Sequence, residues 1–140
     1  MCNTDWTVGQ HLIVLWNLMS DFVLKKLPQN ADVRGVLTVL EKDMPFPVAR
    51  VFWINSAEGA MRGGHRHQRN RQAIVAVHGT VEVYINDGTH EKTIFLDNDG
   101  VMLVVEPEDW HTMTFQPGAV LLVIASDVFD PDDYIGAKHA

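Results

Sequence analysis

From residue 33 onward, the apolar residues form short runs separated by turn-forming residues. Within several runs apolar and polar residues alternate, as in strands with one buried face. Pattern and turn signals together predict strands over residues 36–41, 48–55, 73–77, 80–85, 93–96, 101–105, 110–115 and 119–124. Asn86-Asp87-Gly88 predicts a hairpin between two of them, and Gln116-Pro117-Gly118 predicts the last hairpin. Many short strands with regular turns indicate an all-β sandwich or barrel, and a double-sheet jelly roll is the best interpretation.

Residues 1–30 have a different pattern. Apolar side chains from Leu12 to Val23 recur at helix-like spacing, interrupted at Ser20 and Asp21. A short helix and an irregular packing arm both satisfy this pattern. We therefore expect one domain over residues 31–140, with residues 1–30 as an N-terminal arm of the same domain.

Composition narrows the possible partners. The 140 residues contain 46% apolar and 21% charged residues, ordinary values for a globular protein, and the formal net charge is −7. There is no basic cluster of the kind that nucleic-acid binding requires. The apolar run from Leu12 to Met19 is far shorter than the roughly 20 residues that span a bilayer. With a single cysteine, Cys2, and no basic leader, we expect a cytoplasmic protein with no membrane contact.

The stretch Gly63-Gly64-His65-Arg66-His67 carries the most informative chemistry. In an extended segment the period of two places His65 and His67 on one face, following a turn at the two glycines. His111 begins a later strand. Histidine transfers protons near neutral pH and is also the commonest metal ligand, although a single histidine in a strand is usually structural. Two histidines at this spacing, with a third downstream, favour a functional role.

These segments resemble the two motifs of the cupins, which are jelly-roll barrels. Metal-binding cupins use His-x-His, then a Glu a few residues on, then a final His. Here residues 68–72 read Gln-Arg-Asn-Arg-Gln, with no carboxylate, and Arg71 stands where a Glu is common. Because an arginine repels a divalent cation, the resemblance implies no required metal. Three histidines still leave metal binding open.

The resemblance narrows to the sugar 3,4-ketoisomerases that act on nucleotide-linked 4-keto-6-deoxyhexoses. The similar segments occur in the same order, at residues 32–37, 50–54, 62–67, 107–111 and 125–135. The resemblance implies an isomerase of a dTDP-linked keto-sugar that works through an enediol, without a cofactor, as a homodimer. It assigns His67 as the base for the carbon-bound proton and His65 as the proton shuttle between the two oxygens.

Five further residues are candidates for binding the substrate. Arginine offers a fixed fork of donors that matches diphosphate and enediolate oxygens, which makes Arg50 and Arg62 candidates, with a surface ion pair as the alternative for each. Arg34 is a ligand contact or a turn residue. His111 lines the pocket or is simply buried, and Trp110 stacks on the ligand or fills the core.

Two features of the tail and of one strand complete the expectations. The family tends to carry tyrosines where this chain has Phe52 and Trp53, so a phenolic proton donor is missing there, and His65 is the expected substitute. Residues 127–133 are acidic and are expected to be solvated. A metal-dependent cupin, a non-catalytic sugar-binding cupin and an epimerase stay as alternatives, and the gluco or galacto configuration of the product is left open.

Overall fold

The computed structural model describes residues 22–139, so most of the predicted N-terminal arm, including the helix-like stretch after Leu12, lies outside the described residues. The described chain is almost entirely β-structure. Its elements are β1 (Leu24–Lys26), β2 (Gln29–Asp32), β3 (Gly35–Thr38), β4 (Arg50–Asn55), β5 (Met61–His67), β6 (Gln72–His78), β7 (Val81–Asn86), β8 (Glu91–Leu96), β9 (Val101–Val105), β10 (Trp110–Phe115), β11 (Val120–Ala125), the 3₁₀ helix η1 (Pro131–Asp133) and β12 (Tyr134–Ile135).

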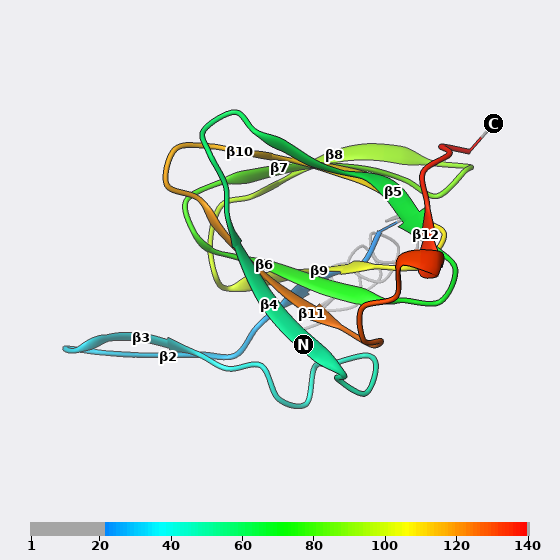
Figure 1. The fold of residues 1–140 in the computed structure, drawn as a ribbon. Helices are drawn as coiled ribbons and strands as arrows, with labels where there is room; N and C mark the ends of the chain where they lie inside the picture. Colours follow the sequence, from blue (N-terminus) through cyan, green and yellow to red (C-terminus); the bar gives the residue numbers. More distant parts are fainter. Residues whose placement is uncertain (1–21, 140) are drawn as a thin grey trace, which may run out of the picture.

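Two antiparallel five-stranded sheets face each other and form the barrel (Figure 1). One sheet has the order β1-β9-β6-β11-β4, and the other has the order β12-β5-β10-β7-β8. The chain passes repeatedly from one sheet to the other, as in a jelly roll. The predicted all-β cupin jelly roll is therefore confirmed.

The turn signals predicted where the chain reverses but not always which strands then pair. Asn86-Asp87-Gly88 does close the hairpin between β7 and β8, which pair antiparallel. The second predicted hairpin is wrong. The turn at Gln116-Pro117-Gly118 exists, yet β10 and β11 on either side of it belong to opposite sheets. This turn is thus a corner of the barrel, and its residues look the same in sequence as those of a hairpin.

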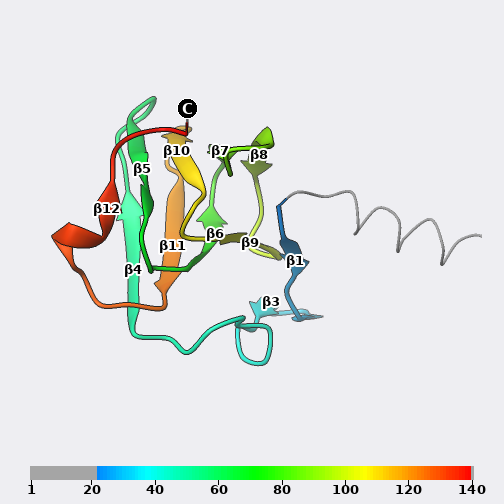
Figure 2. The same cartoon turned by 90° about the vertical axis from the view of Figure 1, so that its right-hand side faces the viewer.

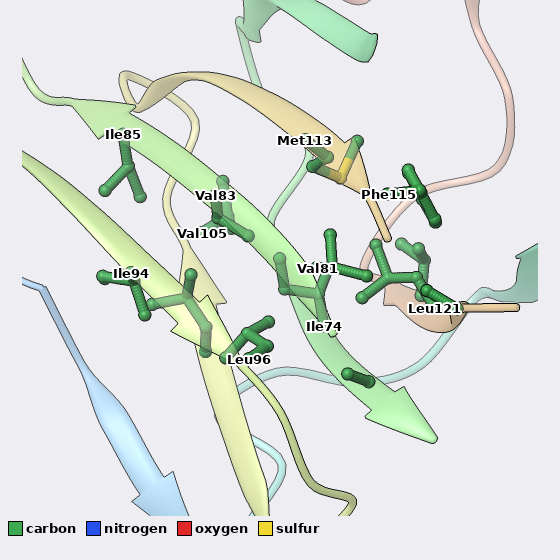
Figure 3. Packing of buried hydrophobic residues seen from close by; sticks show 14 of the residues in the cluster. Ile74, Val81, Val83, Ile85, Ile94, Leu96, Val105, Met113, Phe115 and Leu121 are labelled. Atoms are coloured by element: carbon green, nitrogen blue, oxygen red, sulfur yellow. The ribbon is translucent and has the colours of Figure 1, made fainter. Parts of the chain in front are cut away.

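The main core fills the space between the two sheets (Figure 3). Alternation produces it: on β10, His111, Met113 and Phe115 are buried while the residues between them are partly exposed. From the facing sheet, Ile74 and Leu121 complete the packing. At one end of this interior the buried side chains change from apolar to histidine, which is where the candidate site lies.

A second apolar cluster lies on the outer face of the first sheet. Val75, Met102 and Ile124 are its buried members on the strands, and Phe46 from the loop before β4 covers them. In the view of Figure 2 this loop runs beneath the barrel before β4 begins. Arg71 fastens it: the guanidinium donates to both carboxylate oxygens of Glu106, at 2.7 and 2.8 Å, and to the carbonyl of Pro45 at 2.8 Å. Arg71, just before β6, thus connects the loop before β4 to the loop after β9.

The hairpin of β2 and β3 projects away from the barrel (Figure 1). All four residues of β2 and three of the four in β3 are exposed, and Val36 and Leu37 are among the exposed apolar side chains. A two-stranded hairpin of this kind is barely stable alone in water.

No helix in the described residues is long and apolar enough to cross a bilayer.

Candidate active site

Three neighbouring strands place four aromatic side chains against one another. β5 carries His65 and His67, and strand pairing sets His111 of β10 directly opposite His65. On the other edge of β5, Tyr134 of β12 lies opposite His67. The ring centres of His65 are 5.0 Å from His67, 5.2 Å from His111 and 4.7 Å from Tyr134. The two histidines predicted to share a face therefore do so, and the third joins them.

A β-bulge in β5 aims this cluster. Residues His65 and Gly63 pair with the consecutive residues His111 and Thr112, so Gly64 is the extra residue of the bulge. Gly63 and Gly64 have φ of 88° and 77°, values that favour glycine. The expected turn at these glycines is therefore wrong: they lie inside the strand and bend it. A Cβ on Gly63 would stand 2.6 Å from the carbonyl oxygen of His111.

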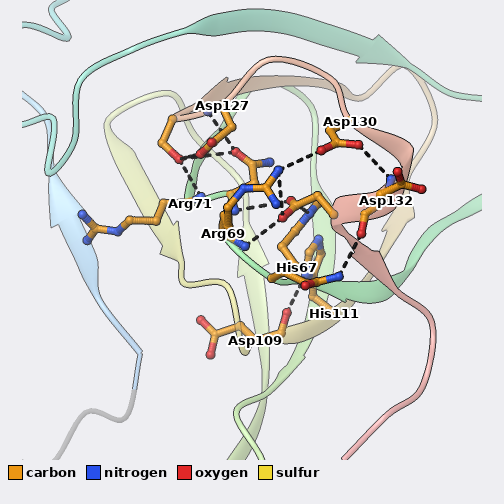
Figure 4. A network of polar contacts seen from close by, with 12 residues as sticks. His67, Arg69, Arg71, Asp109, His111, Asp127, Asp130 and Asp132 are labelled. Atoms are coloured by element: carbon orange, nitrogen blue, oxygen red, sulfur yellow. Dashed lines mark hydrogen bonds and ion pairs between the residues drawn. The ribbon is translucent and has the colours of Figure 1, made fainter.

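His67 is held by a carboxylate from the C-terminal tail. Its Nδ1–H donates to Oδ2 of Asp133 at 2.9 Å, and Asp133 also accepts from the backbone N–H of Arg69 at 2.8 Å (Figure 4). Asp133 is only 3% exposed, so the expectation of a solvated acidic tail is wrong for this residue. The bond fixes the tautomer of His67 and leaves Nε2 with a lone pair. That Nε2 atom is buried and has no hydrogen-bond partner among the described residues.

Burial keeps all three imidazoles neutral near pH 7. It lowers the pKa of His65, with a further contribution from nearby His67. Burial also lowers the pKa of His67, against the opposing effect of the hydrogen bond to Asp133. For His111, which donates its Nδ1–H to the carbonyl of Asp109 at 2.9 Å, burial lowers the pKa to about 4. Among the three histidines, only His67 donates its Nδ1–H to a carboxylate, that of Asp133, while its Nε2 can accept a proton.

The cluster borders a cavity of about 180 Å³ inside the barrel. The polar side chains that line it are Arg62, His65, Gln72, His111 and Tyr134. Apolar side chains from both sheets, Phe52 and Met113 among them, complete the wall. His67 does not itself line the cavity; its ring packs against those of His65 and Tyr134, which do.

Two of the three candidate arginines lie at or beside this cavity. Arg62 lines it, and its Nε donates to Oγ of Ser56 at 3.4 Å. The guanidinium of Arg50 lies 4.3 Å from the ring centre of Phe52, which is part of the cavity wall, and 5.5 Å from that of Phe129. Neither arginine has a carboxylate partner among the described residues. Both cations are therefore available to an anionic ligand.

The structure does not bring Arg34 or Trp110 to the cavity. Arg34 lies at the tip of the projecting hairpin, where it pairs with Asp32. Trp110 follows the alternation of β10 and points to the face opposite His111. There its ring packs at 6.1 Å from Tyr84, and its Nε1–H donates to the carbonyl of Gly136 at 3.1 Å.

Sequence reasoning missed Asp133, Tyr134 and Gln72. The first two enter the site because the chain after β11 folds back over β5, where Gln68 N–H donates to the Asp133 carbonyl at 2.9 Å. Their only local signal is the pair Asp133-Tyr134 within a segment already similar to the ketoisomerases.

No three His, Cys, Asp or Glu side chains within residues 22–139 are arranged to hold a metal ion.

Comparisons with known proteins agree on one group. The family model described as "FdtA: WxcM-like, C-terminal" matches residues 20–140. A TDP-4-oxo-6-deoxy-alpha-D-glucose-3,4-oxoisomerase of Aneurinibacillus thermoaerophilus is 39% identical over 108 residues, which is 74% of this chain and 78% of the relative.

Solved structures give the same result. A mutant of the 3,4-ketoisomerase QdtA from Thermoanaerobacterium thermosaccharolyticum, in complex with TDP-4-keto-6-deoxyglucose, is 33% identical with a TM-score of 0.79, covering 85% of this chain and 89% of that one. The TDP-quinovose 3,4-ketoisomerase WlaRB of Campylobacter jejuni is 32% identical with a TM-score of 0.79, covering 85% and 95%.

Proposed function

The chain belongs to the FdtA (WxcM-like, C-terminal) family, and from this premise we propose that it is a nucleotide-sugar 3,4-ketoisomerase. Its substrate is dTDP-4-keto-6-deoxyglucose, and its product is a dTDP-3-keto-6-deoxyhexose. The observation that carries the proposal is the pair of neutral imidazoles, 5.0 Å apart between ring centres, beside a cavity inside the barrel. This arrangement matches a reaction that moves one proton between carbons and another between oxygens.

His67 is the base in this reaction. Its Nε2 removes the proton from C3, the C3–H electron pair forms the C3–C4 double bond, and the carbonyl pair moves to O4. Asp133 holds the tautomer that exposes the Nε2 lone pair and stabilises the imidazolium that forms. The reverse events at C4 deliver a proton from the His67 imidazolium to carbon, after exchange of that N–H with solvent. His65, which has no carboxylate partner and a lowered pKa, moves the proton between the oxygens.

The size of the cavity supports a binding mode in which the nucleotide lies outside it. Pockets for whole small-molecule ligands usually measure about 300–1,000 Å³. A cavity of about 180 Å³ therefore holds the sugar ring, while the diphosphate and nucleoside extend beyond the mouth. Arg62 in the wall and Arg50 beside Phe52 offer two-point contacts for phosphate or enediolate oxygens.

Proton NMR of the purified protein with dTDP-4-keto-6-deoxyglucose in deuterium oxide tests the function. We expect conversion to the 3-keto isomer with deuterium incorporated at C4, and the product spectrum assigns the gluco or galacto configuration. His67→Asn should abolish conversion. His78→Asn, which changes an exposed histidine at the end of β6, is the matched control and should leave the rate unchanged. Binding of the sugar without conversion or exchange would contradict the proposal.

The functional unit in this proposal is a homodimer. Two apolar surfaces of the described chain lack a cover: the β2–β3 hairpin, with Val36 and Leu37, and the outer face of β4, where Val51 and Trp53 are exposed. Exposed apolar surface of this kind marks an interaction site, and a second copy of the chain supplies matching surfaces by symmetry.

A further inference from the structure

Tyr134 places a phenol beside both imidazoles. Its ring centre lies 4.7 Å from that of His65 and 4.8 Å from that of His67, and its side chain lines the cavity. Backbone pairing with His67 holds it there, together with the Asp133 carboxylate that precedes it in the chain. A phenolic hydroxyl both donates and accepts hydrogen bonds.

The opposite wall lacks such a group. Phe52 of β4 lines the same cavity with a bare ring, and Trp53 points to the outer face, where it is 66% exposed. The chain contains two tyrosines. The other one, Tyr84, lies on the far side of its sheet, where its hydroxyl bonds to Glu91 and its ring packs on Trp110. Tyr134 is therefore the one phenol placed to meet a substrate oxygen.

We propose that Tyr134 is the catalytic acid that protonates O4 of the keto-sugar and is reloaded by His65; the inference rests on the proposed function. As His67 takes the C3 proton, the carbonyl pair collects on O4, and the Tyr134 hydroxyl gives its proton to that oxygen. The enediol and a phenolate result. His65 then takes the proton from O3 with one nitrogen and returns a proton to the phenolate from the other. The O3 pair closes the new C3 carbonyl, and the double-bond pair takes the proton held on His67 at C4.

Every proton is accounted for in this relay. Tyr134 ends in its starting state, and His65 ends neutral with its proton on the other nitrogen, from which exchange with solvent restores the starting tautomer. His67 takes one proton from C3 and delivers one to C4, and the hydroxyl proton moves from O3 to O4. The relay uses His65 because this histidine lines the cavity together with Tyr134, whereas the His67 ring, equally close to Tyr134, does not line it. A single imidazole would otherwise have to serve two oxygens that lie on adjacent carbons.

Three variants test the assignment. Tyr134→Phe should lower kcat for dTDP-4-keto-6-deoxyglucose about 100-fold, the lower range of what general acid catalysis contributes, with KM changed less than threefold. Tyr84→Phe is the matched control and should keep the wild-type kcat. Adding Phe52→Tyr to Tyr134→Phe places a phenol on the opposite wall of the same cavity and should recover at least a tenfold part of the loss.

Measuring the binding of TDP alone distinguishes a catalytic role of Tyr134 from a structural one. Tyr134→Phe should bind TDP with wild-type affinity and melt within a few degrees of the wild type. A Tyr134→Phe variant with wild-type kcat overturns the assignment, and so does one that loses TDP binding together with activity. If the wild-type protein fails to convert the sugar, the proposed function fails; if only the Tyr134 variant behaves as wild type, the function stands and the acid lies elsewhere.

Discussion

At the scale of single residues, Asp133 and His67 form a buried hydrogen-bonded pair. The effect of Asp133 on His67 as a base depends both on this geometry and on the charge of the carboxylate. Asp133 accepts from His67 and from the backbone N–H groups of Arg69 and Asn70. Burial raises the pKa of this carboxyl, but these hydrogen bonds outweigh burial, so that its pKa is lowered on balance. Asp133 is thus ionised at neutral pH and acts on the substrate only through His67, as a positioning residue.

Asp133→Asn should lower kcat roughly 10- to 100-fold, because the amide no longer stabilises the imidazolium. Since the carboxylate raises the pKa of His67 against the effect of burial, its loss should also move the acid limb of the kcat profile to lower pH. Rates measured from pH 5 to 9 test both effects. Asp132→Asn, an exposed neighbour, is the control. An unshifted acid limb would show that Asp133 has only a structural role.

Asp109 is buried behind His111, and burial raises its pKa to about 6. Its unfolded value is near 3.8, so between these values the folded protein binds more protons than the unfolded one. Asp109 therefore costs stability as pH rises through this window. The buried His111, with a folded pKa of about 4, has the opposite effect, and stability falls as pH drops from 6.5 toward 4.

Asp109→Asn removes the cost of ionising this carboxyl and keeps an acceptor for the Glu106 N–H. We expect it to stabilise the fold by on the order of 1–3 kcal/mol at pH 8, with a gain that vanishes near pH 4. Thermal melts across this range measure the effect. Glu58→Gln changes an exposed carboxyl on another loop and should give a flat difference. A pH-independent change in Asp109→Asn would contradict the assigned ionisation.

The residues that sequence reasoning found and those it missed differ in a physical way. His65 and His67 are two apart in one strand, so the period of two is enough to place them together. Asp133 lies 66 positions from His67, and no local pattern reports that the tail folds back over β5. The phenol missing at Phe52 was assigned to a histidine for the same reason, since Tyr134 reaches the site only through the pairing of β12.

At the scale of elements, the bulge in β5 decides how His65 meets His111. Gly63 and Gly64 both have positive φ, so alanine at either position costs roughly 1–2 kcal/mol in backbone strain. Only at Gly63 would the new Cβ also meet backbone, the His111 carbonyl at 2.6 Å. Gly64 has open space around it.

Gly63→Ala should therefore push β5 away from β10 and lower both the melting temperature and kcat. Gly64→Ala is the matched variant: it should lose stability only through backbone strain and keep kcat within a fewfold of wild type. Melting curves and NMR rates on the two proteins compare them directly. Equal losses of kcat in both variants would show that the contact with His111 has no part in aiming His65.

At the scale of elements, turn signals predict where the chain reverses but not which strands pair after the turn. Asp-Gly and Pro-Gly identified two chain reversals correctly, because their backbone preferences are local. The identity of the next pairing partner depends on which apolar face the following strand buries. β11 joins the first sheet and buries Leu121 and Val123 against the second sheet, which contains β10. The sequence pattern thus predicts which residues form strands, but it does not predict the order in which the strands pair in the two sheets.

At the scale of the whole molecule, one copy of the described chain leaves apolar side chains exposed on several elements, among them the β2–β3 hairpin and β4. Leu37 of the hairpin is 62% exposed and Trp53 of β4 is 66% exposed. Covering such side chains gains about 25 cal/mol for each Å² of apolar surface removed from water. The β2–β3 hairpin buries few of its own residues and contacts its own barrel mainly near Gln29, which donates to Asp99 at 3.1 Å, so a second copy that covers its apolar side chains would stabilise it.

We therefore expect the wild-type protein to sediment as a dimer at micromolar concentration. Leu37→Asp and Trp53→Ser should each shift it toward the monomer, because a charge or a lost ring then lies in the interface. Phe95→Ser is the matched control: Phe95 is 59% exposed on β8, in the other sheet, and its loss should leave the dimer intact. Sedimentation velocity across a dilution series measures all four proteins. A monomeric wild type would refute the dimer, and a dimer that dissociates with Phe95→Ser instead would place the interface on the other sheet.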